Sequence, residues 1–414
     1  MTIRGIVTAI PHTLGASEVF ALQTNGSTFS GGLTLNGAGA QLQVGTLVLT
    51  VTGLTVTQGT VSVSSGSIAA GASTVSLGAG GTISYTDAGI LVAGAVSNAG
   101  AIQFTTAAGA QWTIGGNFDS SGIVTNTVTN ALTVDGNVSV SGTFDSPTNS
   151  TITMRGAGTT INTATQIGNL ATAASATVSA TVSPLNMAGG LTIGDGTSVS
   201  LGALGATISG AATGTGTATL NGGSSGVTIN GNFSVPAYSA TTATTNLGGA
   251  TVTLSSFNHN GGTVQLTRNG NQALTTNGQA FNNLTLTNAG TDNTTVSGSL
   301  TVAGSLAVQA NQTLSVGNNI LSVTGPTTNA GTIALGNQTA TFNGLVTNAG
   351  GILTGGSNSL SLNSGISGGT LTSSSTVTRV GGAFTPVAFN HNSGTGFWFD
   401  GSAAQSFGDR KSVG

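Results

Sequence analysis

The stretch Phe257-Asn-His-Asn-Gly-Gly-Thr-Val-Gln-Leu266, with the run of short apolar pairs that follows it as far as Gly350, decides the fold. In each pair the two apolar residues lie two positions apart, the spacing that puts both side chains on one face of a β-strand. Asn, Gly and Ser, which favour turns, separate the pairs. The pairs are Leu300 and Val302, Leu306 and Val308, Leu314 and Val316, Leu321 and Val323, and Ile333 and Leu335.

Two intervals between these pairs set the size of the repeating unit. The first runs from Leu300 to Leu321 and spans about 21 residues, and the second runs from Leu314 to Ile333 and spans about 19 residues. A coil of about 20–21 residues with one strand on each of three sides explains both intervals, because each strand then stacks on its counterpart in the coil before it. The pattern therefore predicts an all-β protein that folds as a β-solenoid.

The composition favours the same fold. Charged residues make up 4% of the chain, against roughly 25% in ordinary domains, and there are 68 glycines. Helices gain little from Gly, Thr and Val and need polar outer faces, so helix is disfavoured. Disorder requires low hydrophobicity and usually a high net charge. Here 37% of the residues are hydrophobic and the net charge is −3, so an ordered β structure is expected.

The coil can be followed before the deciding stretch as well. Residues 141–245 continue it most weakly, because Pro147, Pro184 and Pro236 cannot donate to a β-ladder. In the first third of the chain, apolar residues recur at intervals close to one coil, at Leu33, Leu54, Val75, Val96, Phe118 and Val138.

The sequence divides into four regions. The last one gathers three charged residues in a chain that otherwise avoids them, and we expect it to be a non-native tail. The regions are a lead-in at 1–30, a β-solenoid at 31–245, a β-solenoid at 246–407 that repeats Phe-Asn-His-Asn at Phe257 and Phe389, and the tail at 408–414.

Three phrases carry a resemblance to a known class of proteins. They are Phe257-Asn-His-Asn-Gly-Gly-Thr-Val, Phe281-Asn-Asn-Leu-Thr-Leu and Asn329-Ala-Gly-Thr-Ile. They resemble the repeats of bacterial extracellular adhesins of the filamentous-haemagglutinin and autotransporter-passenger type. The resemblance implies a right-handed parallel β-helix and an extracellular or cell-surface location. It also implies partners among the glycans or proteins of host or neighbouring cells. No export signal is recognisable, and the oligomeric state stays open.

The composition also argues against several functions. The chain has no cysteine, so it has neither disulfides nor thiolate metal sites. Six Lys and Arg residues against nine Asp and Glu leave no basic patch, so nucleic acid binding is not expected. No apolar window is long enough for a membrane-spanning helix, so we expect no membrane span in this fragment.

The best candidate for catalysis is a group of three carboxylates, Asp119, Asp135 and Asp145, with Arg155 nearby in the sequence. Polysaccharide-cleaving enzymes with this fold use clustered carboxylates, and an acid–base pair needs two carboxyl groups within roughly 5–10 Å. Asp beside Gly or Ser is also a common turn residue, which explains Asp135 and Asp145 fully. We therefore expect no catalytic residues and no enzyme.

Two motifs invite a metal-binding interpretation. His259 and His391 occupy the repeated phrase, but matched carboxylate or histidine ligands are missing around them, so a role in a turn or ladder is expected. Gly194-Asp195-Gly196 lacks the repeated nonapeptide of calcium-binding β-rolls. We expect neither a metal site nor a cofactor.

Three further motifs suggest other chemistries. Gly222-Gly-Ser-Ser-Gly226 fits the nucleophile-elbow pattern, but Gly and Ser are common here and no helix is expected after it. Thr285 and Thr287 form a Thr-x-Thr pair, which raises ice binding, although no array of such pairs can be traced. Phe397-Trp-Phe399 suggests a sugar-stacking strand, whereas alternating aromatic residues in a β protein are usually core.

The function that the sequence favours is a non-catalytic stalk or passenger segment of a bacterial surface or secreted adhesin, which presents a long binding surface. Two alternatives stay open. The first is a β-helical polysaccharide-degrading enzyme or phage-spike-like depolymerase, and the second is an ice-binding β-solenoid.

Overall fold

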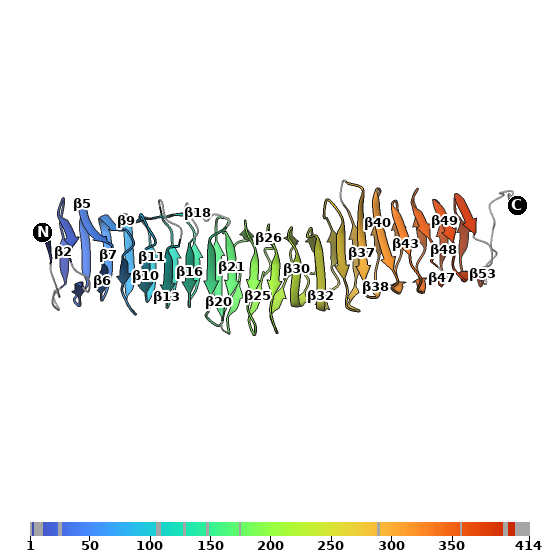
Figure 1. The fold of residues 1–414 in the computed structure, drawn as a ribbon, viewed down its shortest axis with the longest axis horizontal. Helices are drawn as coiled ribbons and strands as arrows, with labels where there is room; N and C mark the ends of the chain where they lie inside the picture. Colours follow the sequence, from blue (N-terminus) through green and yellow to red (C-terminus); the bar gives the residue numbers. More distant parts are fainter. Residues whose placement is uncertain are drawn as a thin grey trace. The chain divides into compact units, whose positions relative to one another are not determined.

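The computed structural model describes residues 2–3, 11–23, 27–104, 109–126, 130–145, 149–173, 175–287, 290–356, 358–391 and 396–401. The regular structure of this part consists of β-strands alone, and their pairings are parallel (Figure 1). The strands stack as a β-solenoid of about 18 turns, which confirms the predicted fold class. Its handedness stays a prediction. Among these residues no helix is long and apolar enough to cross a lipid bilayer.

The chain divides into two compact units, which are described separately. Unit 1 comprises residues 1–210 and 214–220, and unit 2 comprises residues 211–213 and 221–414.

Unit 1 has three ladders of strands, one for each side of the coil. In the first ladder Leu33 pairs with Leu54, Leu54 with Val75, and Val75 with Val96. The ladder continues through Phe118 and Val138, so the apolar series expected from the sequence is confirmed. Its strands are β2 (His12–Leu14), β5 (Leu33–Gly45), β7 (Leu54–Val63), β9 (Thr74–Tyr85), β11 (Ala95–Asn98), β14 (Phe118–Ser120), β17 (Val138–Val140), β20 (Thr159–Thr163), β22 (Thr177–Ser179) and β25 (Ser198–Ser200).

The second ladder shares the long strands β5, β7 and β9, which bend round one corner of the coil and contribute their second halves. Its other strands are β1 (Thr2–Ile3), β3 (Val19–Leu22), β12 (Ala101–Phe104), β15 (Ile123–Asn126) and β18 (Thr143–Asp145). Two further strands of unit 1, β23 (Leu185–Met187) and β26 (Ala206–Ile208), pair with each other.

The third ladder of unit 1 is built from short strands of three or four residues. They are β4 (Ser27–Phe29), β6 (Val48–Val51), β8 (Ser67–Ala69), β10 (Ile90–Ala93), β13 (Gln111–Ile114), β16 (Ala131–Val134), β19 (Thr151–Met154), β21 (Asn169–Thr172) and β24 (Leu191–Ile193).

Unit 2 is built on the same plan. Its first ladder comprises β30 (Phe233–Ser239), β32 (Thr251–Asn258), β34 (Gln272–Thr275), β37 (Asp292–Ser297), β40 (Gln312–Gly317), β43 (Thr332–Leu335), β46 (Ile352–Thr354), β49 (Thr370–Ser373) and β52 (Ala388–His391). β27 (Ala212–Gly214) pairs with β30, and β28 (Thr219–Asn221) has residues in both units.

The apolar pairs of the deciding stretch are distributed over all three ladders of unit 2. Leu300 pairs with Leu321 in one of them, and Leu314 pairs with Ile333 in the first ladder, so both intervals are those of adjacent coils. The second ladder comprises β29 (Val227–Ile229), β31 (Thr244–Leu247), β33 (Thr263–Leu266), β36 (Asn283–Leu286), β39 (Leu306–Val308), β42 (Thr327–Asn329), β45 (Val346–Asn348), β48 (Gly365–Ser367) and β51 (Ala383–Thr385). The third comprises β35 (Ala280–Phe281), β38 (Leu300–Val302), β41 (Leu321–Val323), β44 (Ala340–Phe342), β47 (Ser359–Leu362), β50 (Val377–Val380) and β53 (Gly396–Phe399).

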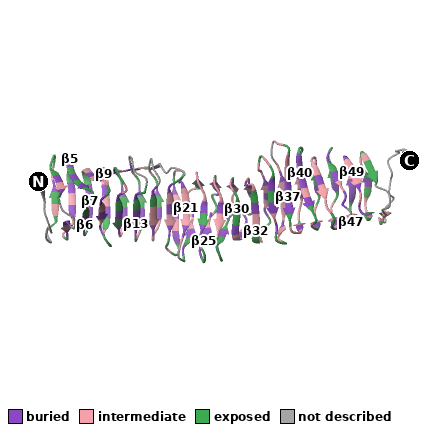
Figure 2. Ribbon diagram, viewed as in Figure 1, coloured by how far each residue is buried: buried purple, intermediate pink, exposed green. Residues whose placement is uncertain are grey.

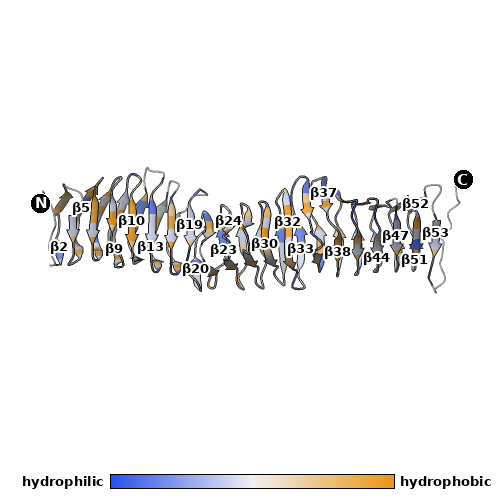
Figure 3. Cartoon of the chain, turned by 60° about the horizontal axis from the view of Figure 1, so that its bottom comes forward, coloured by the Kyte–Doolittle hydropathy of each residue, from blue (hydrophilic) through white to orange (hydrophobic). Residues whose placement is uncertain are grey.

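Side chains alternate between the interior and the surface along each strand (Figure 2). Leu300 and Val302 are buried while Thr301 between them is partly exposed, and the same alternation recurs in β41 and β47. Hydrophobic residues therefore recur in strand after strand (Figure 3), and their columns fill the interior of each unit. Thr suits the outer positions because its branched Cβ favours the extended backbone.

The length of a coil varies because the corners absorb extra residues. The interval between paired residues of adjacent coils is shorter from Val227 to Thr245 than from Val138 to Ile161. The described part of residues 141–245 forms such coils, and most of its strands are short. Pro236 lies inside β30.

The two Phe-Asn-His-Asn copies occupy different positions in the coil. Phe257 lies near the end of β32, whereas Phe389 pairs with the core residue Leu371. The repeated phrase therefore does not mark one fixed place in the coil.

A buried asparagine marks one corner of the coil in both units. Asn98, Asn329 and Asn348 each begin an Asn-Ala-Gly phrase and are at most 2% exposed. Each donates through Nδ2 to a backbone carbonyl of the following coil, at Ile123, Ile352 and Thr370 respectively. Asn329 Nδ2 also donates to Asn348 Oδ1, so these two stacked asparagines form a ladder. Asn288 lies outside the described residues.

Candidate functional site

A shallow polar hollow lies around Asp119 in unit 1. It crosses three successive coils and has a volume of about 160 Å³. Asp119 is exposed on β14, in register with Ser97 on one side and Ser139 on the other. The hollow is lined by Ser97, Asn98, Ala99, Asp119, Ser120, Ser121, Ser139 and Ser141.

Two buried side chains form the inner wall of this hollow. Asn98 is 2% exposed and Ser120 is 3% exposed. Asn98 Nδ2 donates to Ser120 Oγ at 3.0 Å and to the carbonyl of Ile123 at 3.3 Å. The hydrogen bonds hold this corner rigidly, so Asp119 projects from a fixed base with hydroxyl groups on both sides. Such a surface can accept and donate hydrogen bonds to a polar ligand.

The hollow lies at the end of a row of outward hydroxyl groups, which we call the hydroxyl column. Thr13 pairs with Thr34, Thr34 with Thr55, and the register continues to Ser76 and Ser97 before it reaches Asp119. These side chains are exposed or half-buried. The column was not foreseen from the sequence, although its members recur at the same interval as the core residues beside them.

The structure does not assemble the predicted carboxylate cluster. Asp135 lies in a different column, where its two carboxyl oxygens bind the guanidinium of Arg155 at 2.6 and 3.0 Å. Neither residue lines the hollow around Asp119. Asp145, of which only the backbone is described, pairs with Thr125 in β18. The interval from Asp119 to Asp135 is shorter than one coil, and this places the two residues on different parts of the coil.

His259 and His391 have local roles. The Nδ1 atom of His259 accepts a hydrogen bond from the Gly261 amide at 3.0 Å, and the His259 carbonyl accepts one from Gly262. Asn260 between them has a φ of 47°, so this copy of the phrase forms a tight turn. His391 ends β52 and stacks on Phe389 with a ring separation of 5.9 Å. Within the described residues, no group of three His, Asp or Glu side chains could hold a metal ion.

Asp195 also stabilises a turn. Its Oδ1 accepts hydrogen bonds from the backbone amide of Thr217 at 2.8 Å and from the Thr217 hydroxyl at 3.1 Å. These bonds stabilise the carboxylate, first the backbone bond and then the side-chain bond, and they lower the pKa of Asp195. A calcium ion would have to compete with them for the carboxylate, so Asp195 is a structural residue.

The nucleophile-elbow pattern at Gly222–Gly226 lies in a different setting from that of a hydrolase. The Gly223 amide donates to Asn221 Oδ1 at 3.0 Å, and the backbone carbonyl of Ser224 accepts from Thr242. The strand β29 follows the phrase, where a hydrolase has a helix. Ser224 is thus a residue of a corner between two strands.

The Thr-x-Thr pair is not repeated in the adjacent coils. Thr285 pairs with Gln265 on one side and with Ala307 on the other. Thr287 donates through its hydroxyl to Gln309 Oε1 at 2.7 Å. The hydroxyl column of unit 1 is the more regular hydroxyl array.

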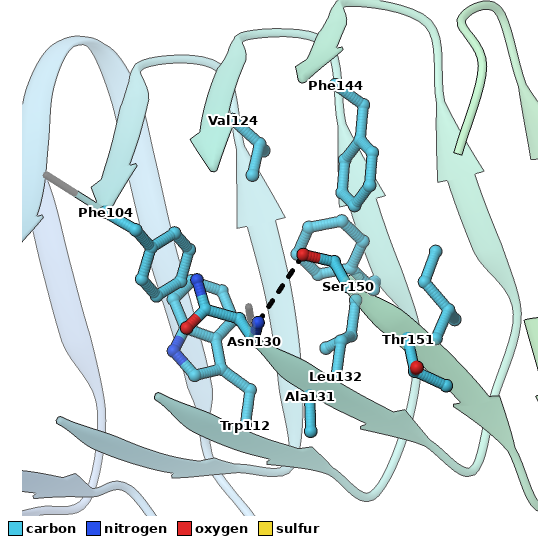
Figure 4. A pocket seen from close by; sticks show the side chains of 11 residues that line it. Phe104, Trp112, Val124, Asn130, Ala131, Leu132, Phe144, Ser150 and Thr151 are labelled. Atoms are coloured by element: carbon cyan, nitrogen blue, oxygen red, sulfur yellow. Dashed lines mark hydrogen bonds between the residues drawn. The ribbon is translucent and has the colours of Figure 1, made fainter. Parts of the chain in front are cut away.

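The interior of unit 1 contains a small aromatic-lined cavity of about 30 Å³ (Figure 4). Phe104, Trp112 and Phe144 lie around it, and the ring centroids of Phe104 and Trp112 are 5.1 Å apart. Asn130 N donates to Ser150 Oγ across its polar side. This volume has room for roughly two water molecules, so it is a small gap in the described part of the core.

The side chains of the aromatic strand β53 alternate between the two faces of the strand. Phe397 and Phe399 both contact Phe384, with ring centroids 5.3 and 5.8 Å apart. Both rings are half-buried, so they pack on the buried residue Phe384 without being fully enclosed. Trp398 points to the opposite face and is 58% exposed.

No family model, no curated protein and no solved structure matches this chain.

Proposed function

We propose that this chain is a non-catalytic structural segment, a stalk or passenger, of a bacterial cell-surface or secreted adhesin. The observation that carries the proposal is the hydroxyl column with the buried ladder beside it. Coil after coil repeats one division between an apolar interior and an uncharged hydroxyl surface. A stack of this kind gains its stability from contacts between neighbours, so it can carry a surface over many coils without a separate core.

The roles of the carboxylates support a structural function. Asp135 and Asp400 pair with arginines, and Asp195 holds a turn. Carboxylates used in this way are held in place by their neighbours, whereas an acid–base pair must face a substrate together.

The adhesin assignment and the extracellular location rest on the resemblance of the repeat phrases. A surface with few charges, stabilised by backbone ladders in a chain without cysteine, suits a protein exposed outside the cell. Partners of such a segment would be glycans or proteins of a host or neighbouring cell.

Surface display tests this proposal. The chain is joined to an outer-membrane anchor at one end and an epitope tag at the other, and the cells are treated with protease. We expect the tag to remain accessible to antibody on intact cells, and the β-solenoid to resist cleavage. Rapid digestion of the chain, or a tag that never reaches the surface, would overturn the stalk role.

A polysaccharide-cleaving enzyme is the second candidate, and the hollow around Asp119 is the feature that favours it. The purified chain is incubated with a panel of polysaccharides, beside the variant Asp119→Asn. Cleavage that the variant loses would replace the structural proposal by an enzymatic one.

Ice binding is favoured by one observation, the regular hydroxyl column from Thr13 to Ser97. Thermal hysteresis of the purified chain would support it, and its loss in a Thr34→Val, Thr55→Val double variant would assign it to this column.

A further inference from the structure

Trp398 is the exposed one of the two tryptophans in the described part of the chain, and side chains of neighbouring residues and strands flank it. The protein has two tryptophans, and Trp112 is buried at 4% exposure whereas Trp398 is 58% exposed. Trp398 points outward from β53, whereas Phe397 and Phe399 on either side of it point towards Phe384. An exposed tryptophan offers a large aromatic surface and an N–H donor to a ligand, so the groups that surround it decide what it can bind.

A glycine lets the indole ring lie along its own strand. The Nε1 atom of Trp398 is 2.8 Å from the position that a Cβ atom on Gly396 would occupy. Any side chain at residue 396 would therefore push the indole away from the strand. With glycine there, the indole can lie over the backbone of residue 396.

Charged groups flank this ring on the same face. Arg379 of β50 is in direct register with Trp398, one strand away. Asp400 lies two residues after Trp398, and its Oδ2 accepts a hydrogen bond from Arg379 Nη1 at 3.2 Å. The side chains of Arg379 and Asp400 are 57% and 45% exposed, so each keeps accessible surface for a further partner. An ion pair therefore lies beside the exposed indole, although only 4% of the residues of the chain are charged.

Hydroxyl groups continue the same face on the preceding coils. Arg379 pairs with Ser361, Ser361 with Thr341, and Thr341 with Ser322. The face thus offers an aromatic plane, a guanidinium, a carboxylate and then a row of hydroxyl groups.

We propose that Trp398, Arg379 and Asp400 form a binding platform for an uncharged sugar ring of a glycan. The C–H face of a pyranose stacks on the flat indole, while its hydroxyl groups bind the carboxylate and the guanidinium at the edge of the ring. The Arg379–Asp400 pair is neutral as a whole, which favours an uncharged sugar over nucleic acid or an acidic polysaccharide. This role goes beyond that of a stalk, since it gives unit 2 a ligand of its own.

The test is binding of the purified full chain to an array of neutral and acidic glycans, followed by isothermal titration calorimetry with the neutral glycans that bind, a measurement that does not depend on Trp398 as a reporter. We expect the variant Trp398→Ala to weaken binding by about tenfold or more, as the loss of one aromatic stacking partner does. Gly396→Ala should weaken it too, because the added Cβ displaces the indole. Arg379→Gln and Asp400→Asn should each reduce affinity while Trp398 remains in place.

Leu345→Ala is the matched control, since Leu345 is 41% exposed in unit 2 and lies outside the platform. It should bind as the unaltered chain does. The proposal would be wrong if no neutral glycan bound, if only acidic glycans bound, or if binding survived Trp398→Ala. Circular dichroism of each variant separates loss of the platform from loss of the fold. A chain that resists protease but binds no sugar would leave the stalk role intact.

Discussion

Asn329 and Asn348 lie one coil apart at the same corner of unit 2, and Asn329 Nδ2 donates a 2.6 Å hydrogen bond to Asn348 Oδ1. Both side chains are fully buried. Each also donates to a carbonyl of the next coil, at Ile352 and Thr370. The corner therefore depends on amide groups whose removal would leave buried polar atoms without partners.

The variant Asn348→Ala should destabilise this corner by about 1–3 kcal/mol, because the Thr370 carbonyl loses its donor and the Asn329 amide loses an acceptor. Asn363→Ala is the matched control. Asn363 Nδ2 donates to Asn343 Oδ1 at the same distance of 2.6 Å, but both residues are exposed and water can replace the bond. We expect the control to change stability by about 0.5 kcal/mol or less. Hydrogen exchange of residues 327–371 measures both effects, and equal losses would contradict the role of burial.

The aromatic cavity of unit 1 predicts a stabilising substitution. Val124 lines this cavity, so Val124→Ile should place one methylene group in it and raise the free energy of unfolding by about 0.8 kcal/mol. Val75→Ile adds the same group at a fully buried position outside the cavity and should lower stability by about 1–3 kcal/mol through overpacking. Urea unfolding followed by circular dichroism compares the two. A loss of stability in both variants would show that the cavity does not accept the group.

The two tyrosines predict how the protein responds to alkali. Burial raises the pKa of Tyr238 to about 12, and burial raises the pKa of Tyr85 as well. An unfolded tyrosine titrates near pH 10. Since the folded pKa is raised, the neutral form stabilises the fold fully below pH 10, and this contribution is lost as the pH rises towards 12 and beyond. Tyrosinate absorbance at 295 nm should therefore be absent at about pH 10.5 in the native chain and appear on unfolding. Normal titration near pH 10 in the folded state would contradict the burial of both rings.

Asp195 predicts a response to acid. Its hydrogen bonds to Thr217 lower the pKa of the carboxyl group in the folded state. The stabilisation is present above the unfolded pKa of about 4 and is lost as the pH falls through the lower folded value. In Asp195→Asn the acceptor remains but does not titrate, so the variant should lose less stability than the unaltered chain between about pH 5 and pH 2. Thermal unfolding across this range measures the difference, and parallel curves would refute the assignment.

The sequence was sufficient to predict the ladders because the interior selects for residue type. Leu33, Leu54, Val75 and Val96 must be apolar in every coil, so their regular interval is visible in the chain. The phrase Asn-Ala-Gly also recurs at Asn329 and Asn348, but the hydrogen bond between the two asparagines was found only in the structure.

The surface was harder to predict, because the coil length varies and small shifts move a residue to another column. Asp119 and Asp135 are close enough in sequence to suggest one cluster. However, the residue that pairs with Asp119 in the next coil is Ser139. Asp135 precedes Ser139 in the chain and therefore lies in another column, where it binds Arg155. The exposure of Trp398 also could not be foreseen. The alternating aromatic pattern of β53 does not indicate which of its two faces meets the core.

The variable corners have a consequence for how such a chain can change in length. The short interval from Val227 to Thr245 and the long one from Val138 to Ile161 both keep the core in register. Duplication or deletion of one whole coil would present the same columns to its neighbours, whereas the gain or loss of half a coil would bring hydroxyl groups against leucines. The evolution of such proteins should therefore favour the gain or loss of whole coils, with single-residue insertions and deletions concentrated at the corners.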